Sequence, residues 1–343
     1  MSSVLTLLVV LSTGAVPDHK AEAVEAYRRK DYKTANRLLV PLAEAEDHEA
    51  AQKLADLYYG GHGVERDVRA AVHWYEKAAV SGDIIAIKNL GAIHMSDKEV
   101  LDLEKAEYWY KKAAATGDAE SMGAMAFLAL ALHNDAKKSQ EWSIKAAEAG
   151  FVEAMISVAR GYFEGKGFPQ DYERAHYWFN RLAEKDIAYG DNGLGMIYSK
   201  GLVGERDLPK ALTHYQRAAA ARLPVAQFNL GRMYMEGDGV EKDYELAVYW
   251  LGEAASRGEV HSILYIGNAY SNGFGVPRDD VRALTAYRIS YSRIPTSELE
   301  HSIRSLEASL NPEELEEAKQ LYEKIIGREL GMEAILPAAR PPK

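Results

Sequence analysis

The sequence predicts an all-α solenoid of about seven helix-turn-helix repeats with capping helices at each end. The first observation is the spacing of Trp74, Trp109, Trp142, Trp178 and Trp250, which lie 35, 33, 36 and 72 residues apart. A scarce, large residue recurring at this interval is typical of a repeat array. The second observation is a glycine pair that returns between candidate helices. The third is an alanine pair that follows several of the tryptophans.

The first helix of each unit follows a fixed pattern over residues 50–290. A small or polar residue opens the unit, a second small residue follows five positions on, and an aromatic or imidazole ring follows eight positions on. These offsets share one face of a helix, so the small residue allows close approach by the next helix. The units open at Ala50, Ala86, Ala119, Ala154, Gly190, Ala226 and Ser262. Their rings are Tyr58, His94, Phe127, Tyr162, Tyr198, Tyr234 and Tyr270.

Glycine pairs are expected to end these first helices, because glycine adopts the left-handed backbone of a helix C-terminus. An acidic residue after the loop is placed to cap the second helix. The loops of the second and third units lack the pair, so either the turn differs there or the superhelix bends. A phosphate cradle would need a preceding strand, which this context lacks. The pairs are Gly61 and Gly63, Gly165 and Gly167, Gly237 and Gly239, and Gly273 and Gly275; the acids are Asp67, Asp171, Asp207 and Asp243.

Capping segments are predicted on both sides of the repeats. Residues 17–49 should form an N-terminal hairpin whose second helix opens at Asp31 and is kinked or broken at Pro41. Residues 291–330 should form two C-terminal helices, 297–309 and 312–329. The first should open with a capping box at residues 297–300, and the second should open at Asn311 with Pro312 in its first helical position. Residues 331–343 are predicted to be a flexible tail.

An apolar segment near the N-terminus predicts export. Residues 4–11 are apolar and are followed by the small residues Thr13, Gly14 and Ala15. The run is far shorter than the roughly 20 residues that span a bilayer, and it resembles a secretory signal without the usual basic start. We expect residues 1–16 to be a signal peptide and the mature protein to be periplasmic. The alternative is a cytoplasmic protein in which this segment is a buried element.

The composition restricts the classes of partner and chemistry. A formal net charge of −10 argues against a nucleic-acid partner, since nucleic-acid-binding domains are usually basic. The chain has no cysteine, which excludes disulfides, thiolate metal sites and a cysteine nucleophile. His94 and His214 occupy the ring and tryptophan positions of their units, so both are expected to pack. We predict no metal, no cofactor, no direct membrane span and no catalytic site.

The repeating unit resembles the Sel-one-like repeat. It reads A-x-x-x-L-G-x-x-Y, then G-x-G-V-x-x-D, then A-x-x-W-x-x-x-A-A-x-x-G, and residues 226–258 match most clearly. The resemblance covers about residues 50–290 and implies a right-handed superhelical, tetratricopeptide-like solenoid. It also implies a protein-binding role, as in adaptors of degradation, secretion or polysaccharide export, or in exported immunity proteins that block an antibacterial effector.

In tetratricopeptide-like hairpins the first helix lines a concave groove, and offsets two, six and nine should face it. These offsets are rich in methionine, which suits adaptable surfaces, and include arginines and rings typical of binding hot spots. The alternative is that offset nine packs against the following loop or the neighbouring unit. The predicted protein-binding residues are Tyr59, Met95, Met125, Arg160, Phe163, Met196, Arg232 and Met235.

The predicted function is therefore a non-catalytic scaffold that holds a partner protein in its groove. Its most concrete form is a periplasmic immunity protein that neutralises an effector such as a phospholipase. One alternative is an adaptor in an envelope secretion or polysaccharide-export complex. An alternative of another class is an enzyme or small-ligand-binding protein, which would need a polar, titratable constellation in the groove.

Overall fold

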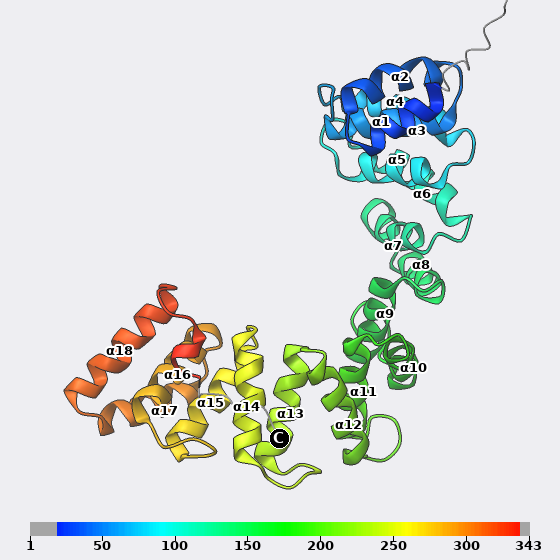
Figure 1. The fold of residues 1–343 in the computed structure, drawn as a ribbon. Helices are drawn as coiled ribbons and strands as arrows, with labels where there is room; N and C mark the ends of the chain where they lie inside the picture. Colours follow the sequence, from blue (N-terminus) through cyan, green and yellow to red (C-terminus); the bar gives the residue numbers. More distant parts are fainter. Residues whose placement is uncertain (1–18, 337–343) are drawn as a thin grey trace, which may run out of the picture. The chain divides into compact units, whose positions relative to one another are not determined.

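The computed structural model describes residues 19–336 and forms only helices there, eighteen α-helices and one short 3-10 helix. The predicted signal segment, residues 1–16, lies outside the described residues, as do residues 337–343. The chain divides into two compact units, Met1–Phe151 and Val152–Lys343. No described helix has both the length and the apolar composition needed to cross a membrane. The predicted all-α repeat fold is confirmed (Figure 1).

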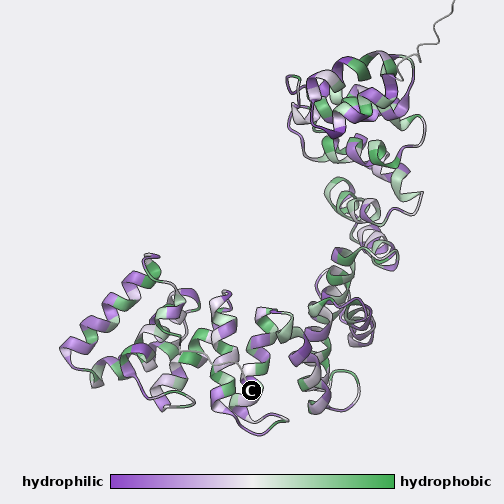
Figure 2. Ribbon diagram, viewed as in Figure 1, coloured by the Kyte–Doolittle hydropathy of each residue, from purple (hydrophilic) through white to green (hydrophobic). Residues whose placement is uncertain are grey.

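Helices of the first unit pair as successive hairpins. The second helix of each hairpin packs against the first helix of the next. Apolar residues recur along the helices (Figure 2), and the buried ones form one core over residues 23–93 and another over residues 106–128. These helices are α1 (His19–Arg28), α2 (Tyr32–Glu44), α3 (His48–Gly60), α4 (Val68–Ala79), α5 (Ile84–Ser96), α6 (Leu103–Ala114), α7 (Ala119–His133) and α8 (Ala136–Glu148).

The second unit repeats this arrangement and ends in two further helices. Its hairpins are α9 (Val152–Glu164) with α10 (Tyr172–Ala183), α11 (Ala188–Lys200) with α12 (Leu208–Ala220), α13 (Pro224–Glu236) with α14 (Tyr244–Ser256), and α15 (Val260–Asn272) with α16 (Asp280–Arg293). They are followed by α17 (Ser297–Ser309), α18 (Pro312–Ile326) and the 3-10 helix η1 (Met332–Ala334).

Turn chemistry follows the sequence prediction. The glycine pairs have left-handed backbone, with φ of 66° at Gly61 and 72° at Gly63. The predicted acids cap the second helices, since the Asp67 carboxylate accepts a hydrogen bond from the Ala70 N–H at 2.9 Å. The corresponding caps are Asp171, Asp207 and Asp243.

One backbone hydrogen bond closes the turn of every repeat. The N–H of the residue that caps the second helix donates to the carbonyl at offset eight of the first helix. The second and third repeats form this bond without a glycine pair, so it is the turn backbone that differs there. The bonds join Asp67 to Tyr58, Asp102 to His94, Asp135 to Ala129, Asp171 to Tyr162, Asp207 to Tyr198, Asp243 to Tyr234 and Asp279 to Tyr270.

The third repeat opens two residues later than the sequence pattern predicts. Asp118 caps α7 by accepting from the Ser121 N–H at 2.8 Å, and Ser121 is buried as the opening residues Ala50 and Ala86 are. The unit therefore opens at Ser121, and offset eight falls on Ala129, where the closing hydrogen bond confirms it. The sequence alignment was wrong here because it placed the ring of Phe127 at offset eight.

Most of the tryptophans are less buried than the residues that directly follow them in the sequence. Trp178 is buried, but the other four are half-buried, and a cation lies over several of the rings at 4.5–5.3 Å. The residue after the tryptophan lies deeper, and at this position Tyr75, Tyr110, Phe179 and Leu251 are buried. In these four repeats a large buried side chain of the second helix therefore lies one position beyond the tryptophan.

The small residue at offset five is where the second helix approaches most closely, as predicted. A Cβ added at Gly195 would lie 2.6 Å from the Tyr215 ring, which is nearer than non-bonded carbon atoms approach. Two other glycines at offset five make the same approach: Gly91 lies against the Tyr110 ring, and Gly267 lies against the Tyr287 ring. A side chain at these positions would separate the two helices of the repeat.

The N-terminal hairpin forms with the predicted start but without the predicted break. Asp31 caps α2 by accepting from the Thr34 N–H at 3.3 Å. The helix then runs through Pro41 to Glu44, so proline does not end it. Its apolar face, including Leu39, joins the core of the following repeats.

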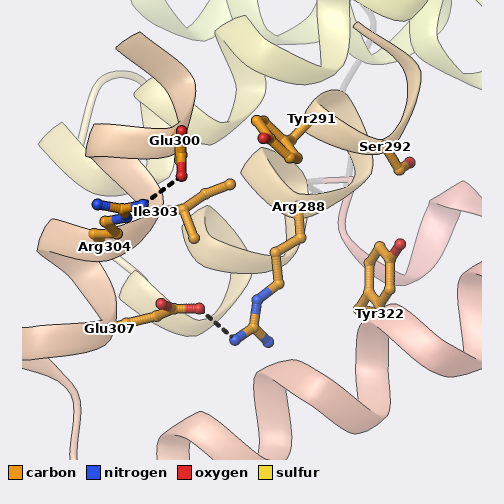
Figure 3. Close-up of a pocket in the computed structure, with 8 residues that line it drawn as sticks. All are labelled: Arg288, Tyr291, Ser292, Glu300, Ile303, Arg304, Glu307 and Tyr322. Carbon is orange, nitrogen blue, oxygen red and sulfur yellow. Dashed lines mark hydrogen bonds and ion pairs between the residues drawn. The ribbon is translucent and has the colours of Figure 1, made fainter. Parts of the chain in front are cut away.

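At the C-terminal end, α17 and α18 both pack on α16. Between them lies a hollow of about 350 Å³, where Arg288 Nη2 donates to Glu307 Oε1 at 2.8 Å (Figure 3). Helix α18 opens at its predicted start, where Asn311 and Glu314 form a capping box. Helix α17 lacks the predicted box at residues 297–300, because Thr296 caps it instead. The start of the predicted flexible tail is corrected, because residues 332–334 form η1 and the following Ile335 is buried in the core.

Candidate functional site

The predicted binding residues fall in both compact units, and each unit is described by itself. In the first unit Tyr59 and Met95 are half-buried, and the Arg66 guanidinium from the following loop lies 5.6 Å from the centre of the Tyr59 ring. Tyr59 thus contacts the loop that follows its helix, which is the packing alternative for offset nine.

Met125 does not lie on an exposed face. It is 2% exposed and belongs to the core formed by α6 and α7, so the prediction that it faces a partner is wrong. The cause is the shifted start of the third repeat. With the unit opening at Ser121, offsets six and nine are Phe127 and Leu130, which are 56% and 51% exposed. Sequence reasoning missed this pair because it had assigned Phe127 to the core.

Helix α7 is therefore apolar on its outer face as well as its inner one. Apart from Glu120 and His133 at its ends, it has no charged or titratable side chain. A helix that is apolar all round is usually buried on all sides. Phe127 and Leu130 lie about one helical turn apart and form an exposed apolar patch. No side chain of the described first unit covers it.

In the second unit the predicted offset-nine residues Phe163 and Met235 pack against neighbouring side chains of the protein. Phe163 is half-buried and lies edge-on to Tyr172 and Phe179, with ring centres 5.7 and 5.9 Å apart. Met235 is partly buried against the core of the last repeat. Arg160, at offset six, is exposed on α9.

Met196 and Arg232, at offset six of adjacent repeats, line one hollow of about 600 Å³. We name this the α11–α13 hollow. Neither Arg160, Phe163 nor Met235 lines it. Its other lining residues are Ser199, Lys200, Arg206, Tyr215, Val225, Phe228, Asn229, Asp238, Glu259 and His261.

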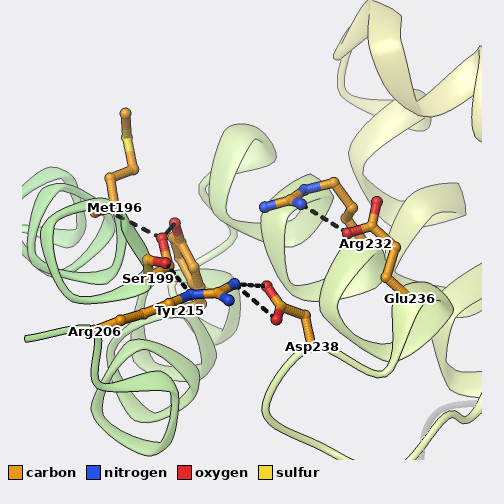
Figure 4. Close-up of polar contacts among 7 residues, drawn as sticks. All are labelled: Met196, Ser199, Arg206, Tyr215, Arg232, Glu236 and Asp238. Atoms are coloured by element: carbon orange, nitrogen blue, oxygen red, sulfur yellow. Dashed lines mark hydrogen bonds and ion pairs between the residues drawn. The ribbon is translucent and has the colours of Figure 1, made fainter. Parts of the chain in front are cut away.

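An ion pair between consecutive loops borders the α11–α13 hollow. Arg206, in the loop after α11, donates from Nη2 to Asp238 Oδ1 at 2.7 Å and from Nε to the Ser199 carbonyl at 2.7 Å (Figure 4). Asp238 lies in the loop after α13, so the pair joins two repeats. Arg232 donates from Nη1 to Glu236 Oε2 at 2.8 Å on the same helix.

Tyr215 is a buried residue in the lining of the hollow. Its hydroxyl lies 3.3 Å from the Ser199 hydroxyl, and burial raises the pKa of Tyr215 above its usual value of 10.0. The phenol is therefore a neutral hydrogen-bonding group at physiological pH. The hollow combines an apolar wall with charged groups at its edge, which suits binding better than proton transfer.

Histidines at repeat positions pack, as the sequence predicts. His94 is buried, and its Nδ1 lies 2.9 Å from the Val100 carbonyl. His214 stacks on the Tyr198 ring, and its Nδ1 lies 2.8 Å from Asp191 Oδ1. Across residues 19–336 no three His, Cys, Asp or Glu side chains are grouped so that they could hold a metal ion.

Stacked hairpins with one closing hydrogen bond per repeat define the chain as a helical repeat scaffold. The family model described as Sel1 repeat matches residues 48–83, 85–118, 124–151, 152–187, 188–222, 224–259 and 260–285, so the chain belongs to the Sel1 repeat family. Proteins of this family typically mediate protein–protein interaction and are generally non-catalytic.

The chain is also similar to solved structures and to a curated protein. A Sel1 repeat protein from Oxalobacter formigenes is 27% identical with a TM-score of 0.68, covering 84% of this chain and 88% of that one. A protective antigen of uropathogenic Escherichia coli with an SLR fold is 24% identical with a TM-score of 0.50, covering 95% and 88%. The chitin synthase regulator SKT5 of Saccharomyces cerevisiae is 27% identical over 154 residues, which are 45% of this chain and only 18% of that protein.

Proposed function

We propose that this protein is a non-catalytic scaffold that holds a segment of a partner protein against its first helices. The observation that carries the proposal is that large apolar side chains at offset six are left accessible, one exposed and one half-buried in the lining of a hollow. Phe127 is 56% exposed in the first unit, and Met196 lines the α11–α13 hollow in the second. Met196 shares the hollow with Arg206 and Arg232, and arginine is enriched among the residues that dominate protein interfaces.

Charge substitution at either of these first-helix positions should weaken partner capture while leaving the fold intact. We expect Met196→Glu and Phe127→Glu each to lower the recovered partner by about tenfold or more, since a buried interface anchor contributes about 2 kcal/mol. The measurement is affinity capture from the native host, with the partner identified and quantified by mass spectrometry. Circular dichroism checks that each variant remains helical.

Tyr177→Glu is the matched control. Tyr177 is 54% exposed, but it lies on the second helix α10 and does not line the hollow. Its variant should capture the partner as the wild type does. Capture that is unchanged in Met196→Glu and Phe127→Glu, or lost equally in Tyr177→Glu, would refute the proposed face.

The narrower role stays a prediction. The role expected from the resemblance is a periplasmic immunity protein that masks an antibacterial effector such as a phospholipase. The alternative is an adaptor of an envelope secretion or polysaccharide-export complex. The identity of the captured partner separates the two, because a secreted toxic enzyme supports the first and an envelope-complex component supports the second.

Export is proposed from the apolar segment at residues 4–11. Deleting residues 1–15 should move the protein from the periplasmic to the cytoplasmic fraction, because the segment that directs secretion is lost. Fractionation with N-terminal sequencing of the full-length protein measures this. Full-length protein that stays cytoplasmic with an intact N-terminus would contradict the proposal.

A further inference from the structure

The acidic groups of the α11–α13 hollow are already engaged inside the protein. Both carboxylate oxygens of Asp238 accept from Arg206 Nη2. Glu259 caps α15, accepting from the N–H of His261 at 3.2 Å and from the N–H of Ser262 at 2.7 Å. These carboxylates orient groups of the protein, so they are poorly placed to attract a basic ligand.

The basic groups of the same hollow keep unused donors. A guanidinium has five N–H groups in a fixed fork. Arg206 uses its Nε and Nη2, and its Nη1 has no partner within residues 19–336. Arg232 donates only from Nη1 within that range, and Lys200, exposed at the end of α11, forms no ion pair there. Unused donors that carry positive charge therefore remain in the hollow.

An apolar wall lies beside these donors. Met196, Val225 and Phe228 line the hollow, and Val225 is 38% exposed. Phe228 is held by contacts with the rings of His261 and Tyr265, at 5.9 and 5.5 Å between centres. The volume of about 600 Å³ has room for a bulky side chain of a partner.

Resting on the proposed function, we infer that the partner segment bound here is acidic and carries one bulky apolar side chain. That side chain enters the hollow against Met196 and Phe228, and flanking carboxylates accept hydrogen bonds from Lys200, Arg206 and Arg232. Charge-assisted hydrogen bonds of this kind are stronger than neutral ones. The net charge of −10 disfavours acidic segments over the surface as a whole, so this local basic edge also selects where such a segment binds.

Fluorescence anisotropy of the full chain with labelled synthetic peptides tests the inference. Three short peptides are compared: phenylalanine flanked by aspartates, phenylalanine flanked by lysines, and glycine flanked by aspartates. We expect the first to bind about tenfold or more tighter than either other peptide. Lys200→Glu should remove most of that preference. Lys185→Glu is the control with the same charge change, since Lys185 is exposed and does not line the hollow.

The outcomes separate the inference from the proposed function. Equal binding of acidic and basic phenylalanine peptides, weakened by Met196→Glu but not by Lys200→Glu, overturns the acidic preference and leaves partner binding at this face intact. Binding of no peptide overturns the assignment of a peptide segment to the hollow. Competition by inorganic phosphate, together with equal binding of the glycine peptide, overturns it in favour of a small-anion site. Loss of the preference in Lys185→Glu as well as Lys200→Glu also overturns it.

Discussion

Replacing Gly195 by alanine is expected to lower the free energy of unfolding by about 1–3 kcal/mol, the range typical of overpacking a filled core. The added methyl group would lie 2.6 Å from Tyr215 Cε1, and Tyr215 is 1% exposed, so the contact between the two helices leaves no room for a methyl group between the Gly195 backbone and the ring. The α11 and α12 helices must separate to accommodate it. Thermal denaturation followed by circular dichroism measures the change.

Gly252→Ala is the matched control for this variant. Gly252 is also a buried helical glycine, but a Cβ added there meets no atom within 4 Å. Alanine in a helix interior is favoured over glycine by about 0.5–1 kcal/mol, so this variant should be more stable than the wild type. Equal effects at the two positions would show that helix propensity, and not the contact between the helices, decides stability at offset five.

Alkaline pH should unfold the repeats through their buried tyrosines. Burial raises the pKa of Tyr27 to about 12, and burial with the neighbouring Asp56 carboxylate raises the pKa of Tyr75 further above its usual value of 10.0. A group whose folded pKa is raised stabilises the native state fully below its unfolded pKa. That contribution is lost as pH rises through the folded pKa. Burial also raises the pKa of Tyr110, Tyr189, Tyr215, Tyr265, Tyr270 and Tyr287.

The stability is therefore present up to about pH 10 and lost above it, as far as about pH 12 for Tyr27. Tyrosinate absorbance and helical circular dichroism, recorded on the same titration, should show exposed phenols ionising first and buried phenols ionising only as helix is lost. Tyr215→Phe should shift the loss of helix to higher pH, whereas Tyr177→Phe should not. Complete ionisation of the tyrosines with the helices intact would contradict this expectation.

Sequence patterns predict the features of this fold that depend on local spacing. Helix starts at Asp31, Asp67 and Asn311 follow from capping residues a few positions from the groups they bind. The left-handed glycines and the small residue at offset five follow in the same way. Each of these features recurs at a fixed register, so one repeat supports the interpretation of the next.

The third repeat shows where that reasoning fails. The ring of Phe127 is the only aromatic one in α7, and it favoured an alignment two residues early. Nothing in the local pattern distinguishes a buried ring from an exposed one when the whole helix is apolar. The cap at Asp118 is the local signal that could have placed the start at Ser121, because the earlier units open three residues after their aspartates.

The candidate site depends on contacts between repeats, which the sequence does not specify. Met196 and Arg232 were predicted from their offset, and the structure places both at one hollow. The pairing of Arg206 with Asp238 joins residues in consecutive loops, and predicting it requires the positions of both hairpins. For the same reason the unused donors of Arg206 and Lys200 become evident only after every intramolecular partner has been assigned.

Site-specific photocrosslinking tests most directly whether the exposed first-helix positions hold the partner. A photoreactive phenylalanine analogue is placed at Met196 or Phe127, and in separate variants at Tyr108 or Tyr177 on second helices. Irradiation of the full chain in its native host should give a covalent partner adduct from the first two positions and none from the last two. Adducts confined to Tyr108 and Tyr177 would contradict the proposed binding face.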